Sequence, residues 1–105
     1  MNYLTRQEEL ILLAVYQLKE SAYLVTIREH LKKHTKKNWS VGAVYVPLDR
    51  MRKRDLLETR IGGSTAKRGR NAIKYYNVTQ LGLQALSAIK QVNDQMWSGF
   101  TPISE

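Results

Sequence analysis

The sequence predicts a mainly α-helical fold with a small β-hairpin wing, that is, a winged helix-turn-helix followed by a C-terminal dimerisation helix. Helix caps and helical apolar spacing recur over residues 5–54, and two strand-like segments flank a loop over residues 56–78. Residues 21–78 carry 14 Lys and Arg against four acids, a net +10, whereas the rest carries three against five, a net −2. A polyanion is therefore expected to meet the middle of the chain.

Length and composition limit the class of protein. With 105 residues, 43% hydrophobic and 25% charged, the chain is expected to form one soluble globular domain. No apolar run approaches the ~20 residues that a membrane span needs, and residues 1–9 do not have the pattern of a secretory signal. The chain has no cysteine, which excludes disulfides and thiolate chemistry.

The first helix is expected to begin after Thr5, because the letters TRQE that end at Glu8 form a capping box. The segment LILLAVYQL that follows is apolar nearly all round, and such a helix is buried on more than one side. In a chain this small, we expect a partner subunit to cover part of it. Leu12 and Tyr16 are predicted to lie in that dimer interface.

The second helix is predicted to run from Thr26 to Lys36, because Thr26 and Glu29 form another capping-box pattern. Leu24 and Val25, before it, are expected to form a short extended segment that pairs with the wing.

The third helix is expected to begin after the cap Ser40, because Val44, Leu48 and Met51 form a core stripe at spacings of four and three. Pro47 lies inside it, and an interior proline typically costs ~3 kcal/mol. A helix is nevertheless predicted here, because the stripe continues on both sides of Pro47.

The strands are predicted over residues 56–61 and 72–78, with a long loop at 62–71. Thr79 is expected to cap the last helix, and residues 101–105 form a frayed tail. Residues 5–78 would thus be the DNA-binding core and residues 79–100 the dimerisation helix. A heptad-like seam is expected at Gly82, Ala85, Ile89, Val92, Met96 and Gly99, with Trp97 as a dimer anchor.

DNA binding follows from the positions of the cations, since they lie on the helix and loop that a winged helix places against a duplex. Base contacts are predicted for the first half of the third helix: Ser40, Gly42, Ala43 and Tyr45. Backbone contacts are predicted for Arg50, Arg52, Lys53 and Arg54, and wing contacts for Lys67, Arg68 and Arg70.

Other functions are also compatible with a basic winged helix. A winged helix can serve as a protein-interaction module, and a basic protein can bind nucleic acid without specificity. His30 and His34, one helical turn apart, can chelate zinc, but no cysteine or carboxylate is placed to complete a site, so no metal and no cofactor are expected. No catalytic set is present, and an enzyme is not predicted.

Two motifs resemble those of the PadR-type transcriptional regulators. GAVYVPLDRM, which begins at Gly42, is similar to the recognition-helix signature of that family, in which a proline is found at the place of Pro47. The segment from Lys74 to Gly82, preceded by Arg70, is similar to the second wing strand leading into the last helix. The resemblance covers residues 10–86, and Asp55 stands where the family usually has glycine.

The resemblance implies a bacterial cytoplasmic repressor. Such a protein would bind double-stranded DNA at a pseudo-palindromic operator, as a homodimer formed through its first and last helices. It also implies that a small hydrophobic effector releases the DNA.

Overall fold

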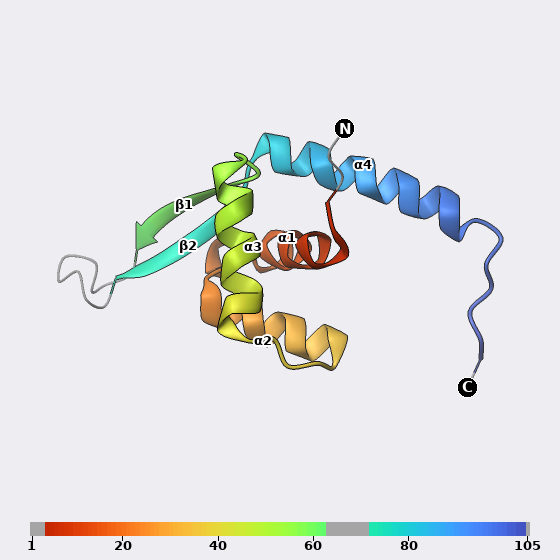
Figure 1. Ribbon diagram of the computed structural model, residues 1–105, viewed down its shortest axis with the longest axis horizontal. Helices are drawn as coiled ribbons and strands as arrows, with labels where there is room; N and C mark the ends of the chain where they lie inside the picture. The colour runs from red at the N-terminus through yellow and green to blue at the C-terminus, as the bar shows by residue number, and fades with distance from the viewer. Residues whose placement is uncertain (1–3, 63–71, 105) are drawn as a thin grey trace.

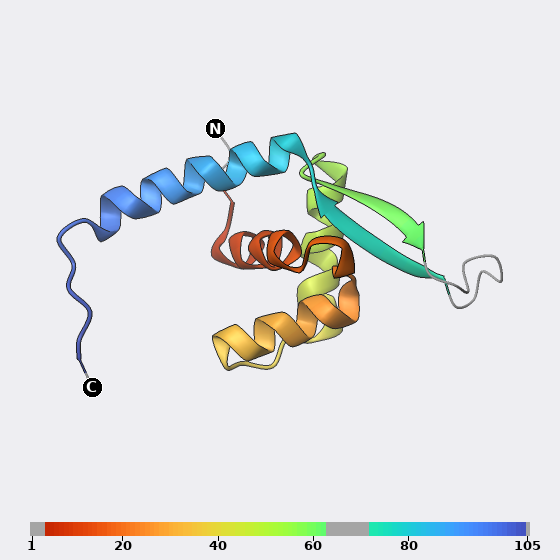
Figure 2. The same ribbon diagram turned by 180° about the vertical axis from the view of Figure 1, so that it is seen from behind.

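The computed structural model describes residues 4–62 and 72–104, and it confirms a mainly helical winged-helix fold (Figure 1). Three helices form the body, a two-stranded hairpin projects from one side, and a fourth helix runs across the top and beyond the body (Figures 1 and 2). The helices are α1 (Arg6–Leu18), α2 (Leu24–Thr35), α3 (Val41–Lys53) and α4 (Gln80–Trp97). The strands are β1 (Leu57–Gly62) and β2 (Ile73–Val78).

Three of the predicted helix caps are confirmed. The Thr5 hydroxyl accepts from the Glu8 amide at 3.1 Å, and the Glu8 carboxylate accepts from the Thr5 amide at 2.9 Å, which completes the capping box. The Ser40 hydroxyl accepts from the Ala43 amide, and that of Thr79 accepts from the Gly82 amide, each at 3.0 Å. Each cap satisfies a helix N–H that would otherwise have no partner.

The predicted start of α2 is wrong. The helix begins at Leu24, with Tyr23 as the residue before it, so Leu24 and Val25 are helical rather than extended. Thr26 lies in the first turn of the helix and stabilises its start: the Thr26 hydroxyl accepts from the Tyr23 amide at 3.0 Å and donates to the Ser21 carbonyl at 2.6 Å. The contact with the wing exists one residue earlier, as a single bridge between Tyr23 and Tyr75.

The core lies where the three body helices and the base of the hairpin meet. The predicted α3 stripe of Val44, Leu48 and Met51 is fully buried, and the helix runs continuously through Pro47. Burial of that stripe on both sides of the proline offsets the lost backbone bond. The other fully buried large side chains are Ile11, Leu12, Val15, Ile27 and Leu57.

The hairpin is antiparallel, with register from Leu57 opposite Val78 to Gly62 opposite Ile73, so the predicted strands are confirmed to within about one residue. Tyr76 points into the core and is almost fully buried, while Tyr75 lies on the other face. The loop prediction for Lys67, Arg68 and Arg70 lies outside the described residues.

The turn after α3 is a Schellman motif. The Leu56 amide donates to the Met51 carbonyl at 2.9 Å and the Asp55 amide to that of Arg52 at 3.0 Å. Asp55 itself has φ +62°, the left-handed conformation in which glycine is favoured.

Replacing Asp55 with glycine is therefore expected to raise the free energy of unfolding by about 0.5–1 kcal/mol, since left-handed backbone costs an L-residue roughly 1–2 kcal/mol. Asp55→Ala is expected to lower it, because alanine keeps the strain and tolerates this conformation less well than aspartate. Urea unfolding at neutral pH measures both variants. Equal stability of the glycine and alanine variants would contradict the assigned strain.

The predicted seam along α4 has a first half that is at least partly buried and an exposed second half. Gly82 is buried against the turn at Leu56, and Ala85 and Ile89 pack on the core of their own chain, whereas Val92 and Met96 are exposed. Gly99 lies beyond the helix, at φ +81°. Within the described ranges, none of the helices is long and apolar enough to cross a membrane.

Candidate nucleic-acid interface

The first half of α3 presents its polar and small side chains to solvent. Ser40, Gly42, Ala43 and Tyr45 are all exposed, with 41% of Tyr45 accessible, while Val44 between them is fully buried. A helix with one face fixed in the core and the other face open has the shape that enters a major groove. All four predicted base-contacting residues are therefore accessible to solvent.

The turn before α3 is fixed by side chains of α2. The Arg28 guanidinium donates to the Trp39 carbonyl at 3.0 Å, and the Trp39 indole donates to the Thr35 hydroxyl at 3.0 Å. Trp39 is buried, as expected for a packing residue. Lys36 ends α2 in a left-handed conformation, which reverses the chain toward α3. These contacts fix the turn from which α3 starts.

The cations at the end of α3 are already partnered by acids. Asp49 pairs with Arg52 at 2.9 Å and with Lys53 at 3.1 Å. The hydrogen bond from Arg52, followed by that from Lys53, lowers the pKa of the Asp49 carboxyl below its usual value. Arg50 is exposed and forms no ion pair with any residue that the structure describes.

Arg54 points away from this surface, toward α1. Its guanidinium lies 3.4 Å from the Glu8 carboxylate, whose side chain is only 5% exposed. A buried carboxylate needs a cation or several donors, so this pair connects the end of α3 to the start of α1. The predicted contact of Arg54 with the DNA backbone stays a prediction, since its side chain is still 34% exposed beside this ion pair.

Lys74 on β2 is a further candidate site residue that the sequence-based prediction did not include. It is exposed, and its Nζ atom lies 6.0 Å from the centre of the Tyr45 ring. The alternation of side chains along β2 could have indicated this position, because Lys74 and the core residue Tyr76 must lie on the same face of the strand. The wing and α3 therefore meet through side chains next to the predicted base-reading surface.

The opposite face of the hairpin is attached to the turn between α1 and α2. The Arg60 guanidinium lies 4.5 Å from the centre of the Tyr75 ring and donates to the Glu20 carbonyl at 3.0 Å. Tyr75 also packs edge-on against Tyr23, with ring centres 5.5 Å apart. Arg60 and Tyr75 thus attach the hairpin to this turn.

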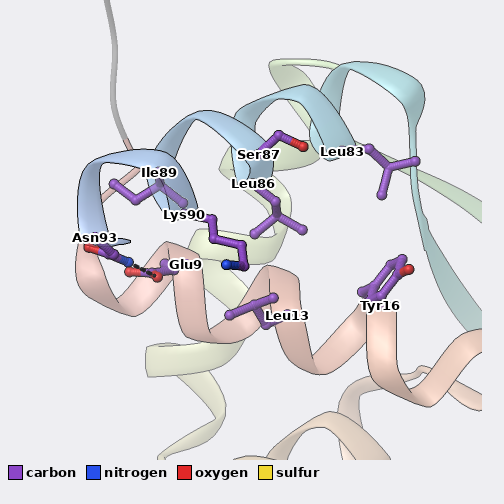
Figure 3. Close-up of a pocket in the computed structure, with 9 residues that line it drawn as sticks. All are labelled: Glu9, Leu13, Tyr16, Leu83, Leu86, Ser87, Ile89, Lys90 and Asn93. Carbon is purple, nitrogen blue, oxygen red and sulfur yellow. Dashed lines mark hydrogen bonds between the residues drawn. The ribbon is translucent and has the colours of Figure 1, made fainter. Parts of the chain in front are cut away.

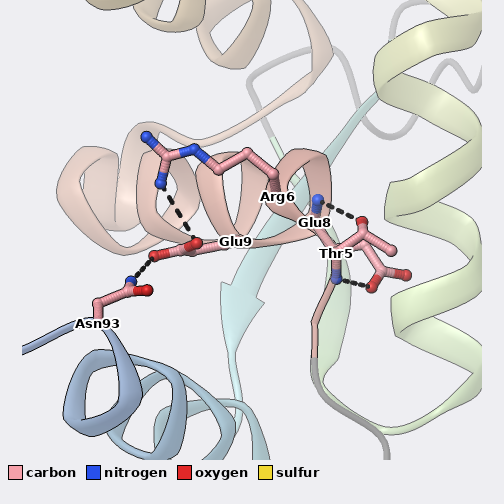
Figure 4. A network of polar contacts seen from close by, with 5 residues as sticks. All are labelled: Thr5, Arg6, Glu8, Glu9 and Asn93. Carbon is pink, nitrogen blue, oxygen red and sulfur yellow. Dashed lines mark hydrogen bonds and ion pairs between the residues drawn. The ribbon is translucent and has the colours of Figure 1, made fainter. Parts of the chain in front are cut away.

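A second surface lies between α1 and α4. A groove of about 580 Å³ runs along these helices, with Leu13, Leu83, Leu86 and Ile89 as its apolar lining (Figure 3). At one end Asn93 donates to the Glu9 carboxylate at 2.8 Å, which also accepts from Arg6 at 3.3 Å (Figure 4).

The residues predicted for the dimer interface lie in three places: the groove, the exposed end of α4 and the core. Tyr16, Val92, Met96 and Trp97 are exposed, and 79% of Met96 is accessible. Ile89 is half-buried in the wall of the groove. Leu12 has no exposed surface even in the single chain, so it packs in the core of its own chain and presents no surface that a partner subunit could contact.

The histidine pair lies on α2, with ring centres 4.4 Å apart. His30 Nε2 is 2.7 Å from the Gln17 amide oxygen, and burial, followed by the charges of His34 and Lys33, lowers the pKa of His30. Over residues 4–62 and 72–104, His, Cys, Asp and Glu side chains form no group of three or more that could hold a metal ion.

Comparisons with known proteins agree with this geometry. The sequence model of the family described as "Transcriptional regulator PadR-like family" matches residues 12–88. A PadR-like transcriptional regulator from Bacillus cereus is 34% identical, with a TM-score of 0.69 over 87% of this chain and 82% of that one. A PadR family transcription regulator from Clostridium difficile is 21% identical, with a TM-score of 0.73 over 91% and 98%.

No curated protein sequence matches the chain. The family match spans more than half of the chain, and the family consists of transcription regulators rather than enzymes. The chain belongs to the PadR-like family of transcriptional regulators.

Proposed function

We propose that the protein is a repressor that binds a pseudo-palindromic operator as a homodimer in the bacterial cytoplasm. The observation that carries the proposal is the exposed face of α3, where Ser40, Gly42, Ala43 and Tyr45 are open to solvent above a buried stripe. In the proposed complex this face meets base edges, while Arg50 and the loop cations Lys67, Arg68 and Arg70 meet phosphates.

The α1–α4 surface supports the proposed homodimer. The groove is apolar in its lining, and the end of α4 projects beyond the body with Met96 and Trp97 exposed (Figure 2). In a two-fold dimer, the projecting end of one α4 would cover the groove of the other copy. A small hydrophobic effector is proposed to act here, because ligands in the groove would alter the distance between the two α3 helices.

Fluorescence anisotropy with the DNA upstream of its own gene, against a shuffled duplex of the same composition, tests the function. Over a salt series, we expect tighter binding to the upstream duplex and a linear fall of log affinity with log salt. Equal affinity for both duplexes would contradict specific regulation. Absence of binding at low salt would contradict a DNA-binding role and would favour a protein-interaction module.

Replacing Val92 with glutamate is expected to weaken the dimer at least tenfold, since burial of an unpaired carboxylate costs several kcal/mol in an apolar interface. Sedimentation velocity over a concentration series measures the change. Gln91→Glu adds the same charge at the preceding, exposed position and is the control. An unaltered dimer with Val92→Glu would place the interface elsewhere.

Replacing Asp49 with asparagine is expected to raise affinity for a shuffled duplex several-fold, because Arg52 and Lys53 lose the acid that neutralises them. The salt slope, that is, the slope of log affinity against log salt concentration, should steepen by about 1 for each released cation that reaches a phosphate. Asp94→Asn removes the same charge and releases Lys90 at the far end of α4, so it controls for net charge. Equal gains in both variants would show an effect of net charge alone.

A further inference from the structure

The contact between the wing and α3 involves two residues that both face solvent. Lys74 and Tyr45 come from different elements, and the Lys74 ammonium lies 6.0 Å from the Tyr45 ring centre, at the outer limit of a cation–π contact. Of the four predicted base-contacting residues, Tyr45 alone has a large side chain. A tyrosine that is 41% exposed on a helix can turn to several rotamers unless neighbours restrict it.

Lys74 approaches Tyr45 from a face of β2 that is fixed in the core. Tyr76, two residues after Lys74 and on the same face of the strand, is buried beneath α3. Burial, followed by the charges of Tyr45 and Asp49, raises the pKa of the Tyr76 hydroxyl. Tyr76 therefore fixes the face of β2 from which Lys74 reaches Tyr45, and Lys74 is the wing residue that restricts the Tyr45 ring.

Lys74 also differs from the cations at the end of α3. Arg52 and Lys53 are paired with Asp49, and Arg54 with Glu8. Lys74 takes part in none of the ion pairs formed among the described residues, and residues 63–71 contain no acid. Its charge therefore remains available for a phosphate beside the groove that α3 would enter.

We propose that Lys74 is a positioning residue for specificity: it contacts a backbone phosphate and, in the same complex, holds the Tyr45 ring in the orientation that reads a base. This inference rests on the proposed function, and it adds a connection between the wing and the base-reading helix. Phosphate contacts alone carry no sequence information. Lys74 is expected to carry such information indirectly, through Tyr45.

The test uses two duplexes: one that the wild-type protein enriches from a random-sequence pool, and a shuffled duplex of the same composition. Lys74→Met is expected to lower the salt slope by about 0.9 with both duplexes. It should also reduce the ratio of the two affinities roughly threefold to fivefold, the size of an exposed cation–π contact. Lys74→Arg keeps the cation over the ring and should retain both the slope and the ratio. Lys53→Met, which removes a cation already paired with Asp49, should leave the ratio unchanged.

A double-mutant cycle separates positioning from simple charge. In a Tyr45→Ala background, Lys74→Met should still lower the slope but should cause no further loss of the affinity ratio. If Lys74→Met weakens both duplexes equally in the wild-type background, the positioning role is wrong. If the slope does not change, Lys74 does not contact a phosphate and the inference is also wrong. If the wild-type protein enriches no sequence at all, it is the proposed function that fails. Matching thermal unfolding of Lys74→Met and Lys74→Arg to that of the wild type verifies that both variants are folded.

Discussion

Replacing Gly82 with alanine is expected to destabilise the protein by about 2–3 kcal/mol, because one added methyl group has no room at the junction of α4 with the body. A Cβ atom at Gly82 would collide with the backbone carbonyl of Leu56 and would lie 2.7 Å from Val78 Cγ1. The Leu56 carbonyl cannot move aside easily, because it accepts from the Thr79 amide at 3.1 Å. The clash therefore exceeds the gain in helix propensity that alanine normally brings.

The same junction connects α4 to the turn after α3. The Thr79 hydroxyl donates to the Asp55 carbonyl at 2.6 Å while it caps α4. Urea unfolding followed by circular dichroism measures the loss of stability in Gly82→Ala. Stability equal to that of the wild type would mean that α4 can move away from the turn without cost. That result would contradict the inference that the junction is rigid.

Local patterns predicted most of the fold. The caps at Thr5, Ser40 and Thr79 depend on side chains within three residues of the helix start, and the α3 stripe depends on helical periodicity alone. The start of α2 was missed because the capping-box pattern at Thr26 does not mark the start of the helix, whereas the one at Thr5 does. A tertiary contact decides where α2 begins. Tyr23 is held in extended conformation by the wing, through its bridge to Tyr75, and the helix begins directly after it.

The candidate site could be predicted only in part, since charge along the sequence does not reveal which cations are partnered. Glu8 and Arg54 are 46 residues apart, and their ion pair depends on how α1 and α3 pack. Leu12 belongs to an apolar stretch, but only the packing of α1 shows that it is buried in its own chain. The exposed face of α3 was predictable, because the buried stripe determines which residues must point the other way.

Replacing Gly42 with alanine is expected to weaken operator binding about tenfold, close to 1.4 kcal/mol, while it stabilises the fold by about 0.5–1 kcal/mol. A Cβ atom at Gly42 would meet nothing within 4 Å, and the position lies in the first turn of α3. Nothing within the described part of the chain requires glycine there. In the proposed complex, however, the added methyl group would lie between α3 and the duplex and would hold the helix away from the bases.

Anisotropy titration and urea unfolding of Gly42→Ala measure the two opposite effects on one preparation. The salt slope should stay unchanged, since no charge is altered, and this separates a lost fit from a lost phosphate contact. Gln84→Ala, at an exposed position of α4, is the matched control and should leave DNA affinity as it was. Gly82→Ala adds the same methyl group where there is no room, so the two glycine variants should change stability in opposite directions. If Gly42→Ala binds the operator as tightly as the wild type, the duplex does not approach the first turn of α3, and the proposed base-reading face is wrong.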